Sequence, residues 1–158
     1  MYNNLFKNIL EPGLMVTHKL LNLRSKIRNK EYENIRILKG NTHKLQFRYI
    51  QLRQEGNLTK YLKHFHNHKE IFDKYRQEIH NFTNNLLNNY KDCFIKKTKH
   101  VKLYPYEYIP HMCKLHEVYL TTLREQFAYI NKPMVIDYVN NLEPQRLMFC
   151  INYNKRNK

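Results

Sequence analysis

The feature that most constrains the fold is a long stripe of apolar residues at helical spacing, between His68 and Lys97. Large side chains recur there every three or four residues, which places them on one face of an α-helix. They are Phe72, Tyr75, Ile79, Phe82, Leu86 and Tyr90. At 1.5 Å per residue the segment predicts about 45 Å of helix. The chain has only 3 Gly and 5 Pro, too few for the many tight turns of a β-sandwich or barrel. The sequence therefore predicts a mainly α fold.

Shorter stripes of the same spacing extend this pattern over most of the chain that follows residue 41. The expected helices start at Thr42 (ending at Gly56), Asn57, His68, Pro110, Met134 and Pro144. Thr42 and Asn57 are expected as N-caps because their side-chain oxygens can accept bonds from the first turn. The sequence therefore predicts a bundle-like domain of five or six helices over residues 42–158.

Residues 1–41 lack such a stripe and are expected to form a peripheral N-terminal segment. Residues 1–30 are interpreted as irregular, with a turn at Pro12–Gly13. Tyr32 to Leu38 is expected as a short strand, which Gly40–Asn41 ends. The segment is therefore predicted to be short, irregular or strand-containing.

The charge balance points to the class of partner. The chain carries 28 Lys+Arg against 13 Asp+Glu, a formal net charge of +15. Such a surplus favours a polyanionic partner, above all nucleic acid. The alternative is a basic but functionally neutral surface, because the abundant Asn, Lys, Ile, Tyr and Phe all have A/T-rich codons. The 13% aromatic content argues against a disordered basic tail. The apolar runs are too short for a membrane span, so no membrane partner is expected.

The cysteines indicate a reducing compartment. Cys93, Cys113 and Cys150 are odd in number, far apart and without a C-x-x-C pair. Polar residues interrupt the apolar residues of 1–16, so no signal peptide is expected. A cytoplasmic location is the expectation.

Nine histidines raise the question of a metal site or a catalytic pair. His64 and His68 would share a helix face, but no acidic or cysteine ligand stands at a standard spacing from them. His111, Cys113 and His116 form H-x-C-x-x-H, yet the first two diverge on a helix. Nothing in the sequence activates Cys113 as a nucleophile, and we expect it to be a small core residue. No metal and no catalytic residue is therefore expected, and the role of the histidines stays open.

The densest local group of positive charges lies between Lys96 and Lys102. Its members are Lys96, Lys97, Lys99, His100 and Lys102. The group is interpreted as a phosphate-binding strip, with a solvated loop between helices as the alternative. The tyrosines that follow, Tyr104, Tyr106 and Tyr108, are candidates for stacking on bases. Their position in a linker also favours packing under the helices with the hydroxyl group outward.

Two stretches resemble a known family. The first is Arg28 to Gly56, RNKEYENIRILKGNTHKLQFRYIQLRQEG, and the second runs from Cys93 to Tyr153 and contains KLYPYEYIPHMCKLHEVYL, VIDYVNNLEPQRLMF and INYN. Together they resemble the C-terminal half of RNA-ligase-like proteins of large nucleocytoplasmic DNA viruses, which are related to ATP-dependent RNA ligases. The resemblance implies an all-helical domain that follows a ligase core, and a viral protein that acts in the host cytoplasm or the viral factory.

The junction between core and helical domain carries most of the matching residues. They are Arg28, Asn29, Tyr32, Glu33, Arg36, Gly40, Asn41, Lys44, Leu45 and Gln46, with Lys39 in place of an arginine. The last core motif of such ligases has lysines that contact ATP phosphates. The resemblance therefore implies nucleotide-phosphate contacts for Lys39 and Lys44.

The chain lacks the catalytic lysine motif of the ligases. Ligases need a nucleophilic lysine in K-x-[DN]-G, three positions before the glycine. In this chain those positions hold Leu10, Ile37 and Arg53, so the motif is missing. The E-G of the family is replaced by Leu23 and Arg24. We therefore expect no enzyme activity and no cofactor.

The expected function is a non-catalytic RNA-binding domain, either as a truncated ligase relative or together with a separate ligase core. The alternative is a protein–protein interaction bundle or a gene remnant, whose basic surface serves solubility.

Overall fold

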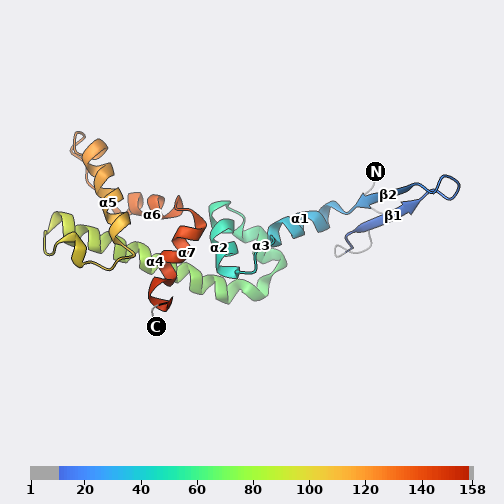
Figure 1. Cartoon of the computed structure of the whole chain (residues 1–158), viewed down its shortest axis with the longest axis horizontal. Helices are drawn as coiled ribbons and strands as arrows, with labels where there is room; N and C mark the ends of the chain where they lie inside the picture. The colour runs from blue at the N-terminus through green and yellow to red at the C-terminus, as the bar shows by residue number, and fades with distance from the viewer. Residues whose placement is uncertain (1–10, 157–158) are drawn as a thin grey trace.

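Helix α4 (Lys69–Tyr90) is the element against which four other helices pack (Figure 1). The computed structural model describes residues 11–156, without the side chain of Arg156. Five of the six residues of the predicted stripe are buried, and Tyr75 is partly buried against the same core. The helix continues as a π-helical turn, Lys91–Ile95. The long amphipathic helix predicted from the sequence is confirmed, although its α-helical part ends at Tyr90 rather than near Lys97.

The remaining helices lie along the length of α4. Their bounds are α2 (Leu45–Gln54), α3 (Leu58–His64), α5 (Ile109–Val118), α6 (Lys132–Asn140) and α7 (Pro144–Arg156). Short 3-10 or π-helical turns occur at His66–His68, Val101–Leu103 and Tyr119–Leu123. The most fully buried apolar side chains are Ile50, Leu52, Ile79, Leu86, Met112, Val135, Val139 and Leu147. The mainly α fold with six helices after residue 41 is confirmed. Within residues 11–156, no helix is long and apolar enough to cross a membrane.

Helix starts lie close to the predicted positions, but neither of the two expected side-chain caps forms. The side chain of Asn131 accepts a hydrogen bond from the backbone N–H of Met134 and so caps α6. Asn57 holds the expected position before α3 but makes no side-chain cap bond. Thr42 does not cap α2, because its hydroxyl accepts from the N–H of Lys44 and the helix begins only at Leu45. The expectation of an N-cap at Thr42 is therefore wrong.

The described part of the N-terminal segment is a β-hairpin followed by a helix, which confirms a strand-containing segment, although residues 11–30 are not irregular as expected. Strands β1 (Gly13–Thr17) and β2 (Arg24–Arg28) pair in antiparallel register, from Gly13 opposite Arg28 to Thr17 opposite Arg24. The reversal falls between the strands, where Asn22 has φ 47°, rather than at Pro12–Gly13. Residues 1–10 lie outside the described residues.

The strand expected from Tyr32 to Leu38 is wrong, because these residues belong to helix α1 (Lys30–Lys39). The side chain of Asn29 accepts bonds from the N–H groups of Glu31 and Tyr32 and so starts the helix. Acidic residues in the first turn and basic residues in the last turn complement the helix dipole. This local capping prevails over the β-propensity of the isoleucines in the segment.

Gly40 and Arg48 join α1 to the helical body. Gly40 has φ 69°, a conformation that L residues rarely adopt, and a Cβ there would lie 3.0 Å from Nε of Arg48. The Arg48 guanidinium donates to the carbonyl oxygens of Ile37 (2.9 Å) and Leu38 (2.9 Å). These are carbonyls that the last turn of α1 leaves unpaired. Figure 1 shows the hairpin and α1 extending away from the other helices as an arm.

Candidate nucleic-acid interface

Residues 96–102, here called the basic loop, connect the end of α4 to the linker before α5. The backbone N–H and the hydroxyl of Thr98 both donate to the carbonyl of Asp92, each at 3.0 Å. The N–H of Leu103 donates to the carbonyl of His100 at 2.9 Å. Lys97 has φ 54°, which turns the chain out of the π-helical turn. Hydrogen bonds therefore hold this loop in a defined shape while its lysines stay exposed.

The four lysines of the basic loop differ in charge environment. Lys96 forms an ion pair with Asp92 (2.9 Å), and this hydrogen-bonded carboxylate raises the pKa of Lys96. No ion pair engages Lys97, Lys99 or Lys102 within residues 11–156. The loop therefore presents three cations whose charge is not already neutralised by a neighbour.

The three linker tyrosines separate into packed and exposed side chains. Tyr108 stacks on Phe82 at a centroid distance of 5.1 Å, and Tyr104 also packs against the core. Tyr106 is 66% exposed and its ring lies 5.9 Å from that of Tyr153 on α7. Packing under the helices is thus observed for Tyr104 and Tyr108, whereas Tyr106 offers a ring face for stacking.

An aromatic cleft of about 640 Å³ lies between the linker and α7. Its lining includes Tyr106, Pro110, Arg146 and Phe149. Two carboxylates also line it: Glu107, which is only 4% exposed, and Glu143, which is exposed. We use the name aromatic cleft for this site below. Aromatic walls beside a guanidinium and a carboxylate are surroundings that accept a nucleobase by stacking and hydrogen bonding.

Within the lining of the aromatic cleft, sequence reasoning proposed an RNA contact for Tyr106 and left the role of His111 open. Arg146 and Phe149 lie some forty residues further along the chain, and only the packing of α7 brings them to the linker. Glu107 accepts a hydrogen bond from the amide of Asn154 at 2.8 Å, a second contact between these segments. No spacing in the sequence reports such a tertiary contact.

His111 is a buried core residue. Its Nδ1 lies 2.8 Å from the hydroxyl of Tyr138, and its Nε2 lies 3.1 Å from Sγ of Cys150. Burial, with Arg146 as a second cause, lowers the pKa of His111 to about 4, and burial raises the pKa of the Cys150 thiol. Both groups are therefore neutral near pH 7, unlike the thiolate–imidazolium pair of a cysteine nucleophile.

The other histidines and Cys113 do not gather into a ligand set. Cys113 is exposed, so the expectation of a core position is wrong. The ring of His116 stacks on Phe94 at 3.9 Å, and Nδ1 of His68 lies 2.9 Å from the hydroxyl of Tyr61. His64 is exposed. In the part of the chain that the structure describes, no three His, Cys, Asp or Glu side chains are grouped as a metal site.

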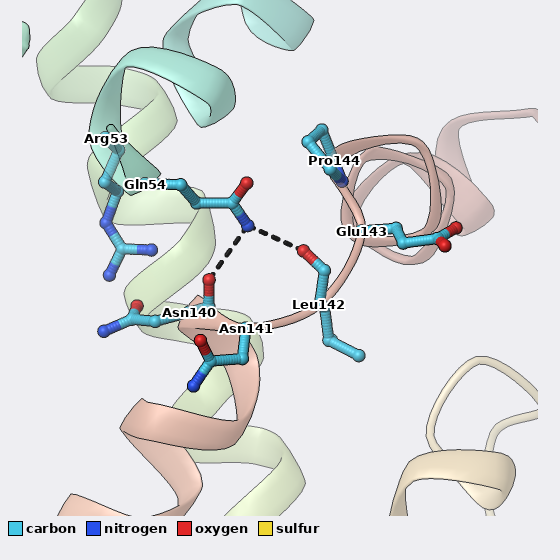
Figure 2. A pocket seen from close by; sticks show the side chains of 7 residues that line it. All are labelled: Arg53, Gln54, Asn140, Asn141, Leu142, Glu143 and Pro144. Carbon is cyan, nitrogen blue, oxygen red and sulfur yellow. Dashed lines mark hydrogen bonds between the residues drawn. The ribbon is translucent and has the colours of Figure 1, made fainter. Parts of the chain in front are cut away.

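The cleft of Figure 2 is a joint between helices. Gln54, in the last turn of α2, donates to the carbonyl oxygens of Asn140 (2.9 Å) and Leu142 (2.6 Å). Arg53 and Glu143 lie at its edges. The Gln54 amide thus satisfies carbonyls where α6 ends and ties α2 to the start of α7.

Lys39 and Lys44 flank the connection between α1 and α2, and both are exposed. Lys44 lines a small cleft with Gln46 and Tyr75, which Lys39 does not line. Figure 1 places this connection away from the basic loop, which follows the opposite end of α4. A phosphate contact by either lysine stays a prediction.

Comparisons with known proteins give no match: no protein family, no curated protein and no solved structure is similar to this chain. The resemblance to RNA-ligase-like proteins rests on the residues quoted for it above.

Proposed function

We propose that this protein is a non-catalytic RNA-binding protein that holds single-stranded RNA at the basic loop and the aromatic cleft. The observation that carries the proposal is the presentation of three unpaired lysines on an ordered loop, a few residues before the exposed ring of Tyr106. Lysines on the loop would neutralise phosphates, and the cleft would take a base by stacking.

Single-stranded RNA fits these surfaces better than a duplex does. Bases are available for stacking only where they are unpaired, and side chains cannot read the deep, narrow major groove of an RNA duplex. The cleft has two aromatic rings, Tyr106 and Phe149, and its polar lining is small, with Arg146, Gln145 and the carboxylates of Glu107 and Glu143. We therefore expect binding with little sequence preference.

The resemblance to the C-terminal half of RNA-ligase-like proteins agrees with this proposal. The non-catalytic part of the proposal rests on the sequence, which has no K-x-x-G and so no nucleophilic lysine in the ligase context. Under this proposal, incubation with ATP and magnesium yields no lysyl-AMP on the purified protein.

The experiment removes the three unpaired cations. Lys99→Ala and Lys102→Ala are combined with Lys97→Asn, because asparagine tolerates the positive φ that alanine does not. Each neutralised phosphate contributes about 0.7 to the log–log salt slope on single strands. The triple variant should therefore lower that slope by about 2, measured by fluorescence anisotropy on a labelled single-stranded RNA over a series of salt concentrations.

A matched control separates a local site from total charge. Lys60, Lys63 and Lys74 are exposed on α3 and the first half of α4, and changing all three to alanine removes the same charge. The control variant should keep the wild-type slope. An equal loss in both variants, or no RNA binding by the wild type at low salt, would contradict the proposal.

The cleft is tested by Tyr106→Ala. This change should weaken binding by about 1–3 kcal/mol without altering the salt slope, because stacking involves no phosphate. Tyr129→Ala, which removes a ring that is 71% exposed outside the cleft lining, is the control.

A further inference from the structure

The register of the hairpin gives its two faces opposite characters. Cross-strand partners lie on the same face of a two-stranded sheet, and neighbours along a strand alternate between faces. One face carries Arg24, Lys26 and Arg28 of β2, opposite Thr17, Met15 and Gly13 of β1. The other face carries Leu14, Val16, Ser25 and Ile27. The hairpin is therefore a ribbon with one basic face and one largely apolar face.

The basic face of the hairpin covers no other part of the described molecule. Arg24, Lys26 and Arg28 are all exposed, and none of them forms an ion pair within residues 11–156. Residues 12–30 contain five cations and no acidic residue. At about 3.4 Å per residue the three side chains follow one another at roughly 7 Å intervals. Such a row of unpaired charges creates a positive potential along one face, which attracts a polyanion.

The basic face and the basic loop lie at opposite ends of the molecule (Figure 1). α1 separates the hairpin from the helical body, and Gly40 with Arg48 ties α1 to α2. A long ligand that is bound at the basic loop can therefore reach the hairpin as well. Its binding to the second site is then an intramolecular step.

We propose that the basic face of the hairpin is a second phosphate-binding strip, which holds the same RNA strand as the basic loop. This inference rests on the proposed function and adds to it that the ligand is an RNA long enough to span the molecule. Residues 13–28 of the hairpin include no aromatic residue, so a short RNA binds at the basic loop, where stacking adds to affinity. A long RNA contacts both strips.

The test compares two RNA lengths on one hairpin variant. Arg24→Gln, Lys26→Gln and Arg28→Gln together remove the charge and keep most of the side-chain length. Single-stranded RNAs of about 10 and about 50 nucleotides are the probes. For the wild type, the long RNA should bind at least about tenfold more tightly than the short one. For the hairpin variant, the affinity for the short RNA should stay within about twofold, and most of the length advantage should be lost.

The apolar face supplies the matched control. Leu14→Thr and Val16→Thr change the other face of the same ribbon with residues of good β-propensity, and circular dichroism checks that both variants keep their fold. This control should retain the length advantage. An unchanged length advantage in the basic-face variant, or its loss only in the apolar-face variant, overturns the inference.

Failure of this inference differs from failure of the proposed function. If the basic-loop variant lowers the salt slope while the hairpin variant behaves as the wild type, RNA binding stands and the second strip does not. If neither RNA binds the wild type at low salt, both proposals fail.

Discussion

The hairpin and the basic loop are both rich in positive charge, but they present it by different means. In the hairpin, strand alternation places three cations on one face, and none of them has an acidic partner in the described chain. In the basic loop, the backbone is irregular, hydrogen bonds to Asp92 and His100 hold it, and one of its four lysines is paired. The density of charge in a sequence is therefore an incomplete guide to the charge that a surface offers.

The two regions also differ in what holds them. The basic loop follows α4 through the π-helical turn Lys91–Ile95, and one face of α4 is buried in the core. The strands of the hairpin pair with each other, and the hairpin projects beyond α1 (Figure 1). Stability is not uniform over such a molecule, and parts with few buried apolar contacts open first. Conditions that act on buried groups should therefore change the stability of the helical body and of the arm to different extents.

We expect acid to have the largest effect, because it should destabilise the helical body more than the arm. His111 has a pKa of about 4 in the folded body against about 6.5 in an unfolded chain, so protons bind the unfolded state preferentially. Protonation of His111 in the unfolded state therefore lowers the free energy of unfolding as the pH falls from about 6.5 towards 4. The expected loss is about 3 kcal/mol. Urea unfolding followed by circular dichroism between pH 7 and pH 4 measures this loss.

His111→Gln should flatten that pH dependence, while the same change at the exposed His80 should not. The ionisable side chains of the hairpin are all exposed, so the hairpin holds no buried histidine like His111. A wild type whose stability is constant from pH 7 to pH 4 would show that His111 is not buried as described.

Substitution at the joint between arm and body should have the next largest effect on stability. Gly40→Ala combines a positive φ with a Cβ that meets Arg48 at 3.0 Å, whereas Gly56 has a similar φ of 68° and open space around its Cβ. We expect Gly56→Ala to cost about 1 kcal/mol of stability and Gly40→Ala about 1 kcal/mol more. Equal costs in urea unfolding would mean that the contact with Arg48 does not hold the joint.

The smallest predicted effect concerns the paired lysine of the basic loop. Asp92→Asn removes the carboxylate that neutralises Lys96 and should raise the salt slope of RNA binding by about 0.7. Asp73→Asn is the matched change, because it releases Arg76 on the first half of α4 and should leave the slope unaltered. A rise of the same size in both variants would assign the effect to net charge.

The helical body was largely predictable from the sequence, and the arm was not. The stripes that define α2 to α7 depend on local spacing, which a sequence displays directly. The hairpin depends on pairing between Leu14 and Ile27 and their neighbours, and the alternation of Arg24, Lys26 and Arg28 falls within the stretch that was expected to be irregular. In α1, the cap at Asn29 decided against the expected strand.

The candidate interface divides in the same way. The density of lysines identified the basic loop, and the spacing of Asp92 and Lys96 was available in the sequence as a helical ion pair. The aromatic cleft was not predictable, because it requires α7 to place Arg146 and Phe149 against the linker at Tyr106. Only the assembled helices define which rings share a cleft.

The most direct test of the account is a lysine-labelling footprint, read by mass spectrometry, with and without RNA at low salt. We predict protection of Lys97, Lys99 and Lys102 by short and long single-stranded RNA, and protection of Lys26 only by the long RNA. The exposed control lysines on α3 and α4 named above should react equally in all samples. Uniform protection of all these lysines, or protection of none of them under conditions where RNA is bound, would contradict the account.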